Sequence, residues 1–380
     1  MSQPQTIPSE ARFAMVTCAH GAESAVKQSL APERWRLAFS RPGFVTLKRD
    51  GGDAEDGADL PSGVFVRTAA HSLGSCRDAD ADRLIDAMLT AARETPFEHI
   101  HVWPRDRLPI GKFDFEPGID LVCQAVAERL VTRITQPADW TASDRSSGDN
   151  EAALPWDRLP IGSSVPVNQI AQKGQRVLDL VLIDPSHWFF GWHTVDSITS
   201  AWPGGIQPID PVYPPISRAY FKAAEAIAWS GFEMLPADVA VEVGSAPGGA
   251  CGRLLELGLQ VIAIDPAPMD PRIAGHPKLK HHAARAGDLP RKHYRGAKWL
   301  LVDSNVRPEA TLSTVKNIVT HRQCHFRGLL ITMKLGTYER AREIDAWVAT
   351  IRSWPRVTDI RVRQLARNRC EVCFAVTMVP

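Results

Sequence analysis

A strand, a glycine-rich loop and a helix follow one another in residues 239–258, and this segment constrains the fold more than any other. Gly244, Gly248 and Gly249 allow sharp turns and a close approach of the backbone to a ligand. A purely structural turn and a dinucleotide-binding loop are the alternatives. The spacing G-x-x-x-G-G differs from the dinucleotide pattern G-x-G-x-x-G, and Pro247 stiffens the loop, so a dehydrogenase is disfavoured.

Strands and helices alternate through the C-terminal half of the sequence. We expect strands at 239–243, 259–264, 299–302 and 329–333, and helices at 217–229, 250–257, 308–322 and 338–353. This alternation predicts an α/β fold with a mostly parallel, Rossmann-like sheet covered by helices on both faces. Two further strands, at 360–365 and 372–378, are joined by a short turn and predict an antiparallel edge pair.

A proline- and glycine-rich segment, 201–216, separates this half from the rest. Proline lacks an amide donor and restricts the residue before it, so the segment is expected to be neither helix nor central strand. We therefore predict an N-terminal α+β region at 1–200, a linker at 201–216 and a catalytic domain at 217–380.

Composition and charge limit the cellular location and the partners that the sequence allows. The 380 residues contain no apolar run of about 18, so no membrane partner is expected. The seven scattered cysteines and the absence of a signal-peptide pattern at the N-terminus predict reduced thiols and a cytoplasmic location. The net charge is only +1, but 272–300 holds eight Lys or Arg against one acid, and 352–369 is rich in arginine. These stretches are either solvated faces or surfaces that face phosphates.

The loop SAPGG (245–249) resembles the cofactor loop of the FtsJ-type ribose 2'-O-methyltransferases. Further motifs follow in that family's order: SRAYFKAAEA at 217–226, LLVDSN at 300–305, ITMKLG at 331–336 and RCEVCFAV at 369–376. The family has a Lys-Asp-Lys-Glu tetrad, and the matching positions are Lys222, Asp303, Lys334 and Glu371. The resemblance implies an S-adenosylmethionine-dependent methyltransferase domain.

Three stretches look like one subgroup of that family, the bacterial large-subunit rRNA cytidine 2'-O-methyltransferases: FKAAEA, IDPAPMDP and MKLGTYERAREI. That subgroup carries an N-terminal THUMP-containing region, an RNA-binding module. The resemblance implies that RNA, specifically 23S rRNA, is the partner and that DNA is not. A monomer is favoured.

The tetrad roles that the resemblance implies follow from ribose chemistry. A 2'-hydroxyl must lose its proton to attack a methyl group, and a lysine accepts a proton only when it is neutral. We assign Lys334 as the general base and Lys222 as the neighbouring cation that favours the neutral form. Asp303 would orient Lys334, and Glu371 would position Lys222 or the ribose. The duller alternatives are a helix cap at Asp303 and a surface ion pair between Lys222 and Glu371.

The cofactor site implied by the same motifs combines the glycine loop with three acids. Asp265 lies at the end of the next strand, where a carboxylate suits a ribose diol. Asp288, in the basic stretch, is the candidate for the adenine amino group, with a simple turn as the alternative. The predicted cofactor-binding residues are Gly244, Ala246, Pro247, Gly248, Gly249, Asp265, Asp288 and Asp303.

No metal site is predicted. Cys370 and Cys373 form a C-x-x-C, but positions three apart on a strand face opposite sides. Trp188 and Trp192 either pack in a core or stack on bases, and packing is favoured. A non-catalytic RNA-binding protein and a small-molecule methyltransferase remain as competing functions. The intact tetrad argues against the first, and the large N-terminal region and the basic stretches argue against the second.

Overall fold

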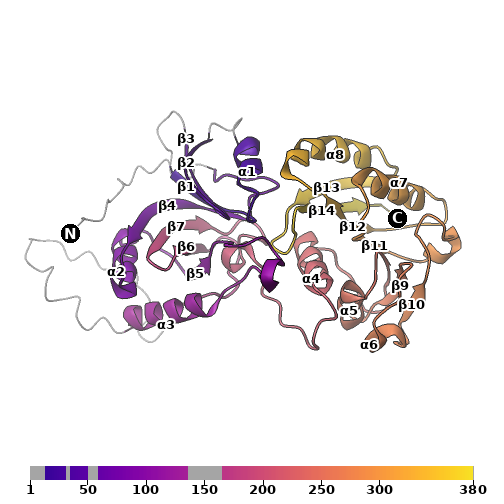
Figure 1. Ribbon diagram of the computed structural model, residues 1–380, viewed down its shortest axis with the longest axis horizontal. Helices are drawn as coiled ribbons and strands as arrows, with labels where there is room; N and C mark the ends of the chain where they lie inside the picture. Colours follow the sequence, from indigo (N-terminus) through magenta and orange to yellow (C-terminus); the bar gives the residue numbers. More distant parts are fainter. Residues whose placement is uncertain (1–12, 31–34, 50–58, 136–164, 380) are drawn as a thin grey trace, which may run out of the picture. The chain divides into compact units, whose positions relative to one another are not determined.

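The computed structural model describes residues 13–30, 35–49, 59–135 and 165–379 and divides the chain into two compact units, 1–208 and 209–380 (Figure 1). The division lies inside the predicted linker 201–216. The start of that segment is a short, buried 3-10 helix, η4 (Pro203–Gly205), which belongs to the first unit. All seven cysteines are free. In the described part of the chain, no helix is long and apolar enough to span a membrane.

The first unit is built on a mixed seven-stranded sheet with the order β2-β3-β1-β4-β7-β6-β5. Only the β5–β6 pair is parallel, and the other neighbours run antiparallel. The strands are β1 (Phe13–Thr17), β2 (Trp35–Arg41), β3 (Phe44–Arg49), β4 (Thr68–Arg77), β5 (His99–Pro104), β6 (Arg176–Asp184) and β7 (His187–Thr194). The helices are α1 (Glu23–Leu30), α2 (Ala81–Ala91) and α3 (Leu121–Thr135), with a short 3-10 turn, η2 (Lys112–Asp114).

The sheet of the first unit is buried on both faces at β6, as the nearly continuous apolar sequence of that strand requires, whereas the edge strand β2 is largely exposed. Leu180 packs with residues of α2 and α3 in one core, whereas its neighbour Val181 packs with Phe44 and Trp103 in another. Trp188 is only 2% exposed and lies in the first of these cores, which confirms the packing role predicted for it.

A buried ion pair joins two loops of this unit. The guanidinium of Arg67 donates two hydrogen bonds to the carboxylate of Asp106, at 2.7 and 2.5 Å. The two side chains are 5% and 2% exposed. Charges this far from water are stable only as a pair, so each residue depends on the other.

The second unit is also built on a seven-stranded sheet, with the order β10-β9-β8-β11-β12-β14-β13. The strands are β8 (Val239–Val243), β9 (Gln260–Ile264), β10 (Leu279–His282), β11 (Trp299–Val302), β12 (Gly328–Lys334), β13 (Val357–Arg363) and β14 (Glu371–Met378). The helices are α4 (Ala219–Ser230), α5 (Gly249–Glu256), α6 (Pro271–Ala274), α7 (Pro308–Val319) and α8 (Ile344–Arg352), with 3-10 turns η5 (Arg291–Tyr294) and η6 (Tyr338–Glu343). Strands β8 to β12 are parallel, and β14 runs antiparallel to both β12 and β13.

Helices cover both faces of this sheet, as predicted: α4 and α5 lie on one side, and α7 and α8 on the other (Figure 1). The central strand β11 is therefore buried along its whole length. The predicted antiparallel pair is present, but β14 is inserted between β12 and β13, so only β13 lies at the edge. Strand β10, which pairs with β9 at the opposite edge, was not predicted from the sequence.

Substitution of Arg67 by Ala is expected to destabilise the first unit by about 3–5 kcal/mol, because it leaves the Asp106 carboxylate buried without a counter-charge. The measurement is denaturant unfolding of the full chain. Arg83 provides the matched control, since its contact with Asp78 is 3.7 Å and its side chain is 73% exposed. Arg83→Ala should cost less than about 1 kcal/mol. Equal effects of the two substitutions would contradict this account of the pair.

Candidate active site

Two neighbouring strands of the second unit, β8 and β11, define where a ligand can bind. From β8 the chain builds the sheet outward through β9 and β10, and then returns to place β11 on the other side of β8. Parallel sheets open a crevice at the carboxyl ends of the strands where their order reverses in this way. Gly244 follows β8 and Asp303 follows β11, so the first predicted site residues lie at this crevice.

The backbone at the crevice is too close for any residue but glycine at position 244. Gly244 has φ +82°, and a Cβ atom there would lie 2.4 Å from the carbonyl oxygen of Asp303. The amide of Asp303 also donates to the carbonyl of Val243 at 3.0 Å. The glycine loop and the Asp303 turn are therefore held together directly through their backbones.

Four elements supply the predicted tetrad. Lys222 lies in α4, Asp303 directly follows β11, Lys334 ends β12 and Glu371 begins β14. The antiparallel register of β12 and β14 sets Lys334 opposite Glu371. Side chains directly opposite on neighbouring strands are close enough to interact, so strand pairing itself delivers one half of the site.

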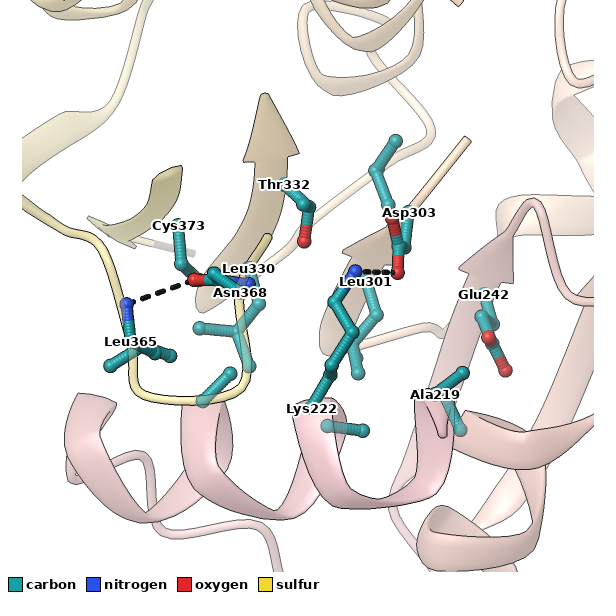
Figure 2. Close-up of a pocket in the computed structure, with 14 residues that line it drawn as sticks. Ala219, Lys222, Glu242, Leu301, Asp303, Leu330, Thr332, Leu365, Asn368 and Cys373 are labelled. Atoms are coloured by element: carbon teal, nitrogen blue, oxygen red, sulfur yellow. Dashed lines mark hydrogen bonds and ion pairs between the residues drawn. The ribbon is translucent and has the colours of Figure 1, made fainter. Parts of the chain in front are cut away.

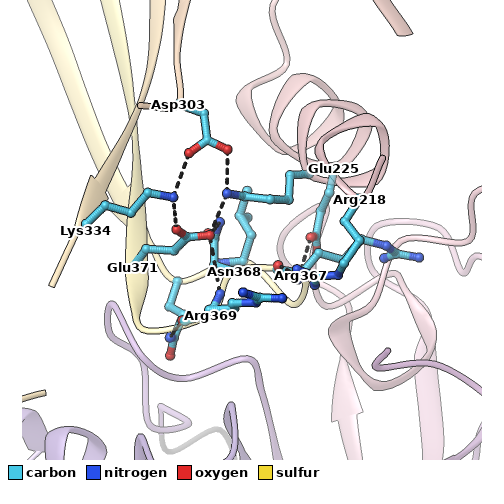
Figure 3. Close-up of polar contacts among 11 residues, drawn as sticks. Arg218, Glu225, Asp303, Lys334, Arg367, Asn368, Arg369 and Glu371 are labelled. Atoms are coloured by element: carbon cyan, nitrogen blue, oxygen red, sulfur yellow. Dashed lines mark hydrogen bonds and ion pairs between the residues drawn. The ribbon is translucent and has the colours of Figure 1, made fainter. Parts of the chain in front are cut away.

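The four side chains form a closed ring of ion pairs, which we call the tetrad ring (Figure 3). The Lys222 ammonium lies 2.6 Å from the Asp303 carboxylate and 2.6 Å from that of Glu371. The Lys334 ammonium lies 2.8 Å from the other oxygen of Asp303 and also donates to the second oxygen of Glu371. Each amine thus touches both acids, and each acid touches both amines.

The acids of the ring are held in their charged form. Burial raises the pKa of Asp303, but the charges of Lys222 and Lys334 outweigh this effect and lower it overall. Burial also raises the pKa of Glu371, but the charges of Lys222 and Lys334 outweigh this effect and lower the pKa overall. Glu371 is the more buried of the two acids, at 4% exposed against 24% for Asp303.

The Lys334 amine is stabilised as a cation in this ring. Burial lowers the pKa of Lys334, but the charges of Glu371 and Asp303 and their hydrogen bonds raise it overall. A lysine in this state cannot accept a proton. Burial and Lys222 therefore do not suffice to keep Lys334 neutral, and a base role needs a further positive charge nearby or loss of contact with an acid.

The predicted cofactor loop is shaped by its glycines. Gly248 has φ +117°, and a Cβ there would lie 2.3 Å from the side chain of Ile273. A Cβ at Gly249 would lie 2.2 Å from the hydroxyl oxygen of Ser217. Gly248, the residue before α5, has no side chain to cap that helix, and the amide of Cys251 in its first turn instead interacts with the carboxyl of Glu242.

Asp265 is placed where a cofactor ribose could meet it. It follows β9, and its carboxylate accepts hydrogen bonds from the amide of Ala246, at 3.3 Å, and from that of Ala267, at 2.8 Å. These bonds hold the acid against the glycine loop and leave it lone pairs for further donors. A carboxylate beside a glycine loop can accept hydrogen bonds from the ribose hydroxyls of an adenosine-containing cofactor, so these residues fit S-adenosylmethionine.

Asp288 is the remaining predicted cofactor-binding acid. It is exposed, in a turn before η5, and its amide donates to the carbonyl of Arg285 at 3.0 Å. Asp288 therefore lies in a turn, which is the alternative considered for it. Its contact with the adenine amino group stays a prediction.

A small pocket under the tetrad ring contains an acid that the sequence analysis did not single out. The pocket lies between α4 and the sheet, and Lys222, Asp303, Thr332 and Glu242 are among its lining residues (Figure 2). Glu242 is 2% exposed, and its Oε2 atom has no hydrogen-bond partner among the described residues. Burial raises the pKa of Glu242 to about 8. The sequence carried one sign of this site, which is an acid inside the apolar strand VAVEV. A glutamate is rarely fully buried unless it is paired.

No protein-family model matches the chain. The chain is similar to proteins named Ribosomal RNA large subunit methyltransferase M. It is 28% identical to the protein of Marinobacter nauticus, and the match covers 66% of this chain and 71% of the relative. It is 25% identical to the protein of Azotobacter vinelandii, and this match covers 57% of this chain and 65% of the relative. The match to the Halorhodospira halophila protein is 29% identical and covers 49% of this chain and only 55% of the relative.

Among solved structures, the fibrillarin pre-rRNA processing protein of Methanococcus jannaschii matches with a TM-score of 0.34 and 13% identity over 43% of this chain and 76% of that one. The sequence relatives confirm the resemblance predicted from the motifs. The chain is thus a methyltransferase, an enzyme class for which S-adenosylmethionine is the expected cofactor.

Substitution of Glu242 by Gln is expected to flatten the dependence of stability on pH. The pKa of Glu242 in the folded chain, about 8, lies above the ordinary 4.5, so between these values the folded state binds the proton more tightly than the unfolded state. Stability from this group is therefore present at low pH and is lost as the pH rises, by about 1.4 kcal/mol per pH unit. Thermal unfolding from pH 5 to 8 measures this.

The exposed Glu233 supplies the control, because Glu233→Gln should leave the pH dependence of wild type unchanged. An equal loss of stability with pH in wild type and in Glu242→Gln would show that Glu242 is charged in the folded chain.

Proposed function

We propose that the chain methylates the ribose 2'-hydroxyl of a cytidine in 23S rRNA, with S-adenosylmethionine as methyl donor. The sequence similarity to the rRNA large subunit methyltransferases supports this proposal, and the reaction is proposed to take place in the cytoplasm. The observation that carries the proposal is the tetrad ring beside the glycine loop. Two amines and two carboxylates from four separate elements converge at the crevice of a parallel sheet. An ordinary surface ion pair needs no such convergence and contributes little stability.

The cofactor would be held by the backbone of the glycine loop and by Asp265, with Asp288 as the candidate for its adenine end. When bound, it supplies an electrophilic methyl group on a positively charged sulfur. Asp303 lies at the meeting point of the glycine loop and the tetrad ring, so we assign it to orient both Lys334 and the reacting groups.

Lys334 is the proposed general base. In the resting ring its amine is charged, so a proton must leave before catalysis. Lys334 is 27% exposed, so its proton would have a route to water once a positive charge beside the ring lowers the pKa of Lys334 by repulsion. The neutral amine would then take the proton of the 2'-hydroxyl, while the methyl group passes from sulfur to the ribose oxygen and leaves a neutral thioether.

Lys222 and Glu371 keep the base in position. Lys222 stays between both acids and compensates one of their two negative charges when Lys334 becomes neutral. Glu371 contacts both amines through its two carboxylate oxygens. Its side chain is almost fully buried, which keeps it in place. Alignment of the hydroxyl with the methyl group contributes a large part of the rate in such reactions.

The first unit is proposed to be the THUMP-containing RNA-binding region. Its size and its mixed sheet with helices are compatible with an α+β module. A non-catalytic RNA-binding protein is the second candidate. Labelled S-adenosylmethionine incubated with unmodified 23S rRNA and with small metabolites separates the candidates, because only the proposed function puts label on ribose of the RNA.

Substitution of Lys334 by Ala is expected to reduce methyl transfer by at least about 10²–10⁴-fold, the usual contribution of a general base. Binding of S-adenosylmethionine should change little, because Lys334 belongs to the proton-accepting part of the site. Single-turnover transfer to RNA and calorimetric titration with the cofactor measure the two effects. Lys316, an exposed lysine of α7, is the control, and substantial turnover by Lys334→Ala would refute the assignment of the base.

Substitution of Asp265 by Ala is expected to weaken the affinity for S-adenosylmethionine by roughly 10–100-fold, because hydrogen bonds to a charged acceptor are lost. Isothermal titration calorimetry measures the affinity. Asp345, an exposed acid of α8, offers a matched Asp→Ala control. Unchanged affinity in Asp265→Ala would remove Asp265 from the cofactor site.

A further inference from the structure

The loop between β13 and β14, residues 364–370, passes beside the tetrad ring and is held rigidly (Figure 3). The side chain of Glu225, in α4 and 1% exposed, accepts hydrogen bonds from the amides of Ala366 and Arg367 at 2.9 and 3.0 Å. Within the loop, Asn368 Oδ1 accepts from the amide of Leu365 at 2.9 Å. Buried hydrogen bonds of this kind fix the backbone of the loop relative to α4.

The position of Arg369 is tied directly to the ring. Its amide donates to Oε1 of Glu371 at 3.4 Å, and its carbonyl accepts from Nε2 of Gln364 at 2.6 Å. The same amide group of Gln364 donates to the hydroxyl of Tyr338 at 2.9 Å, which joins this loop to the start of η6. The backbone of Arg369 is therefore fixed on both sides, two residues from a member of the ring.

The side chain of Arg369 is exposed, unlike those of its neighbours in the loop, Asn368 and Ala366. Other arginines of the basic stretch 352–369 serve the fold. The guanidinium of Arg356 donates to the carbonyls of Val319 and Cys324, at 2.5 and 2.8 Å. Arg361 donates to the carbonyl of Ser230 at the end of α4. The guanidinium groups of these two arginines donate hydrogen bonds to carbonyls at chain turns and at a helix end. Among the described residues, no such contact holds the side chain of Arg369.

Further positive charge lies on the same side of the ring. The Arg367 guanidinium lies 5.3 Å from the centre of the Phe221 ring, next to Lys222 in α4. Arg218 donates to the carbonyl of Arg367 at 3.4 Å. The acids nearby, Glu225 and Glu371, are buried and already accept several hydrogen bonds. One exposed acid, Glu339 of η6, also lies close to Cys370, so the exposed charge of this rim is mixed, with arginine in excess.

We propose that Arg369 binds a phosphate of the RNA backbone next to the ribose that enters the tetrad ring. This inference rests on the proposed function. A ribose in RNA carries a phosphodiester on each side, and an exposed guanidinium on a fixed backbone suits phosphate oxygens through two parallel hydrogen bonds. Contacts of this kind set the position of a nucleic acid on a protein and carry no sequence information. Arg369 is thus a substrate-binding residue and takes no part in proton transfer.

The test uses the full chain and a protein-free, unmodified transcript of 23S rRNA. Substitution of Arg369 by Ala should raise the KM for RNA and the Kd from filter binding by roughly tenfold, as expected for the loss of one charge-assisted contact. The rate at saturating RNA and the affinity for S-adenosylmethionine should stay close to wild type. The slope of log Kd against log salt concentration should fall by about 0.7–0.9, the change expected for one phosphate contact.

Two further variants make the result specific. Arg369→Lys keeps the charge and should recover the salt slope, with only part of the affinity, because a lysine lacks the planar fork of donors. Arg352→Ala removes an exposed arginine at the end of α8 and should behave as wild type.

If wild type methylates the transcript but Arg369→Ala keeps its KM and salt slope, the phosphate contact is refuted. A lower maximal rate with unchanged KM would also refute it, since Arg369 would then act through Glu371. If wild type itself transfers no methyl group to the transcript, the proposed function fails and this inference fails with it.

Discussion

The second unit depends on one electrostatic constraint, which is that one buried and one partly buried acid and two amines must neutralise one another at a single point. Lys222, Asp303, Lys334 and Glu371 come from α4, the end of β11, β12 and β14. A buried charge without a partner is costly, so each of these elements is stable in its position only when the other three are present. The ring thus acts as a polar core beside the apolar one, and it fixes how the helix meets the sheet.

The same constraint explains why the site is at rest in the described state. In a ring with equal numbers of amines and carboxylates, charge is balanced, and neither lysine gains by losing its proton. Under the proposed mechanism, a methyl donor with a positive charge would upset this balance and favour proton loss. The site would then gain its basic group only when the donor is bound.

Much of the second unit could be predicted from the sequence because local patterns carry it. Alternating apolar runs and helical periods gave β8, β11 and β12 together with the helices between them. The tetrad was predicted from the resemblance to the FtsJ-type motifs, in which these four positions are matched. Other features depend on tertiary contacts with no local pattern. The short strand β10 lies among basic residues, and only its pairing with β9 makes it a strand.

Glu242 and Arg369 were not predicted for a related reason. The environment of Glu242, under α4 and near Asp303, arises only when the helix packs on the sheet. Arg369 resembles the other arginines of its stretch in sequence. It differs from Arg356 and Arg361 because their guanidinium groups meet backbone carbonyls far away in the chain, which no spacing rule describes.

The insertion of β14 between β12 and β13 has a consequence for how the enzyme is made. Glu371 opens β14, and β14 pairs along its full length with β12, which was synthesised some forty residues earlier. Before β14 pairs with β12, Lys334 has only Asp303 as an acidic partner, because Glu371 is still missing from the site. The tetrad ring can therefore close only after the last strand of the sheet in chain order has been made.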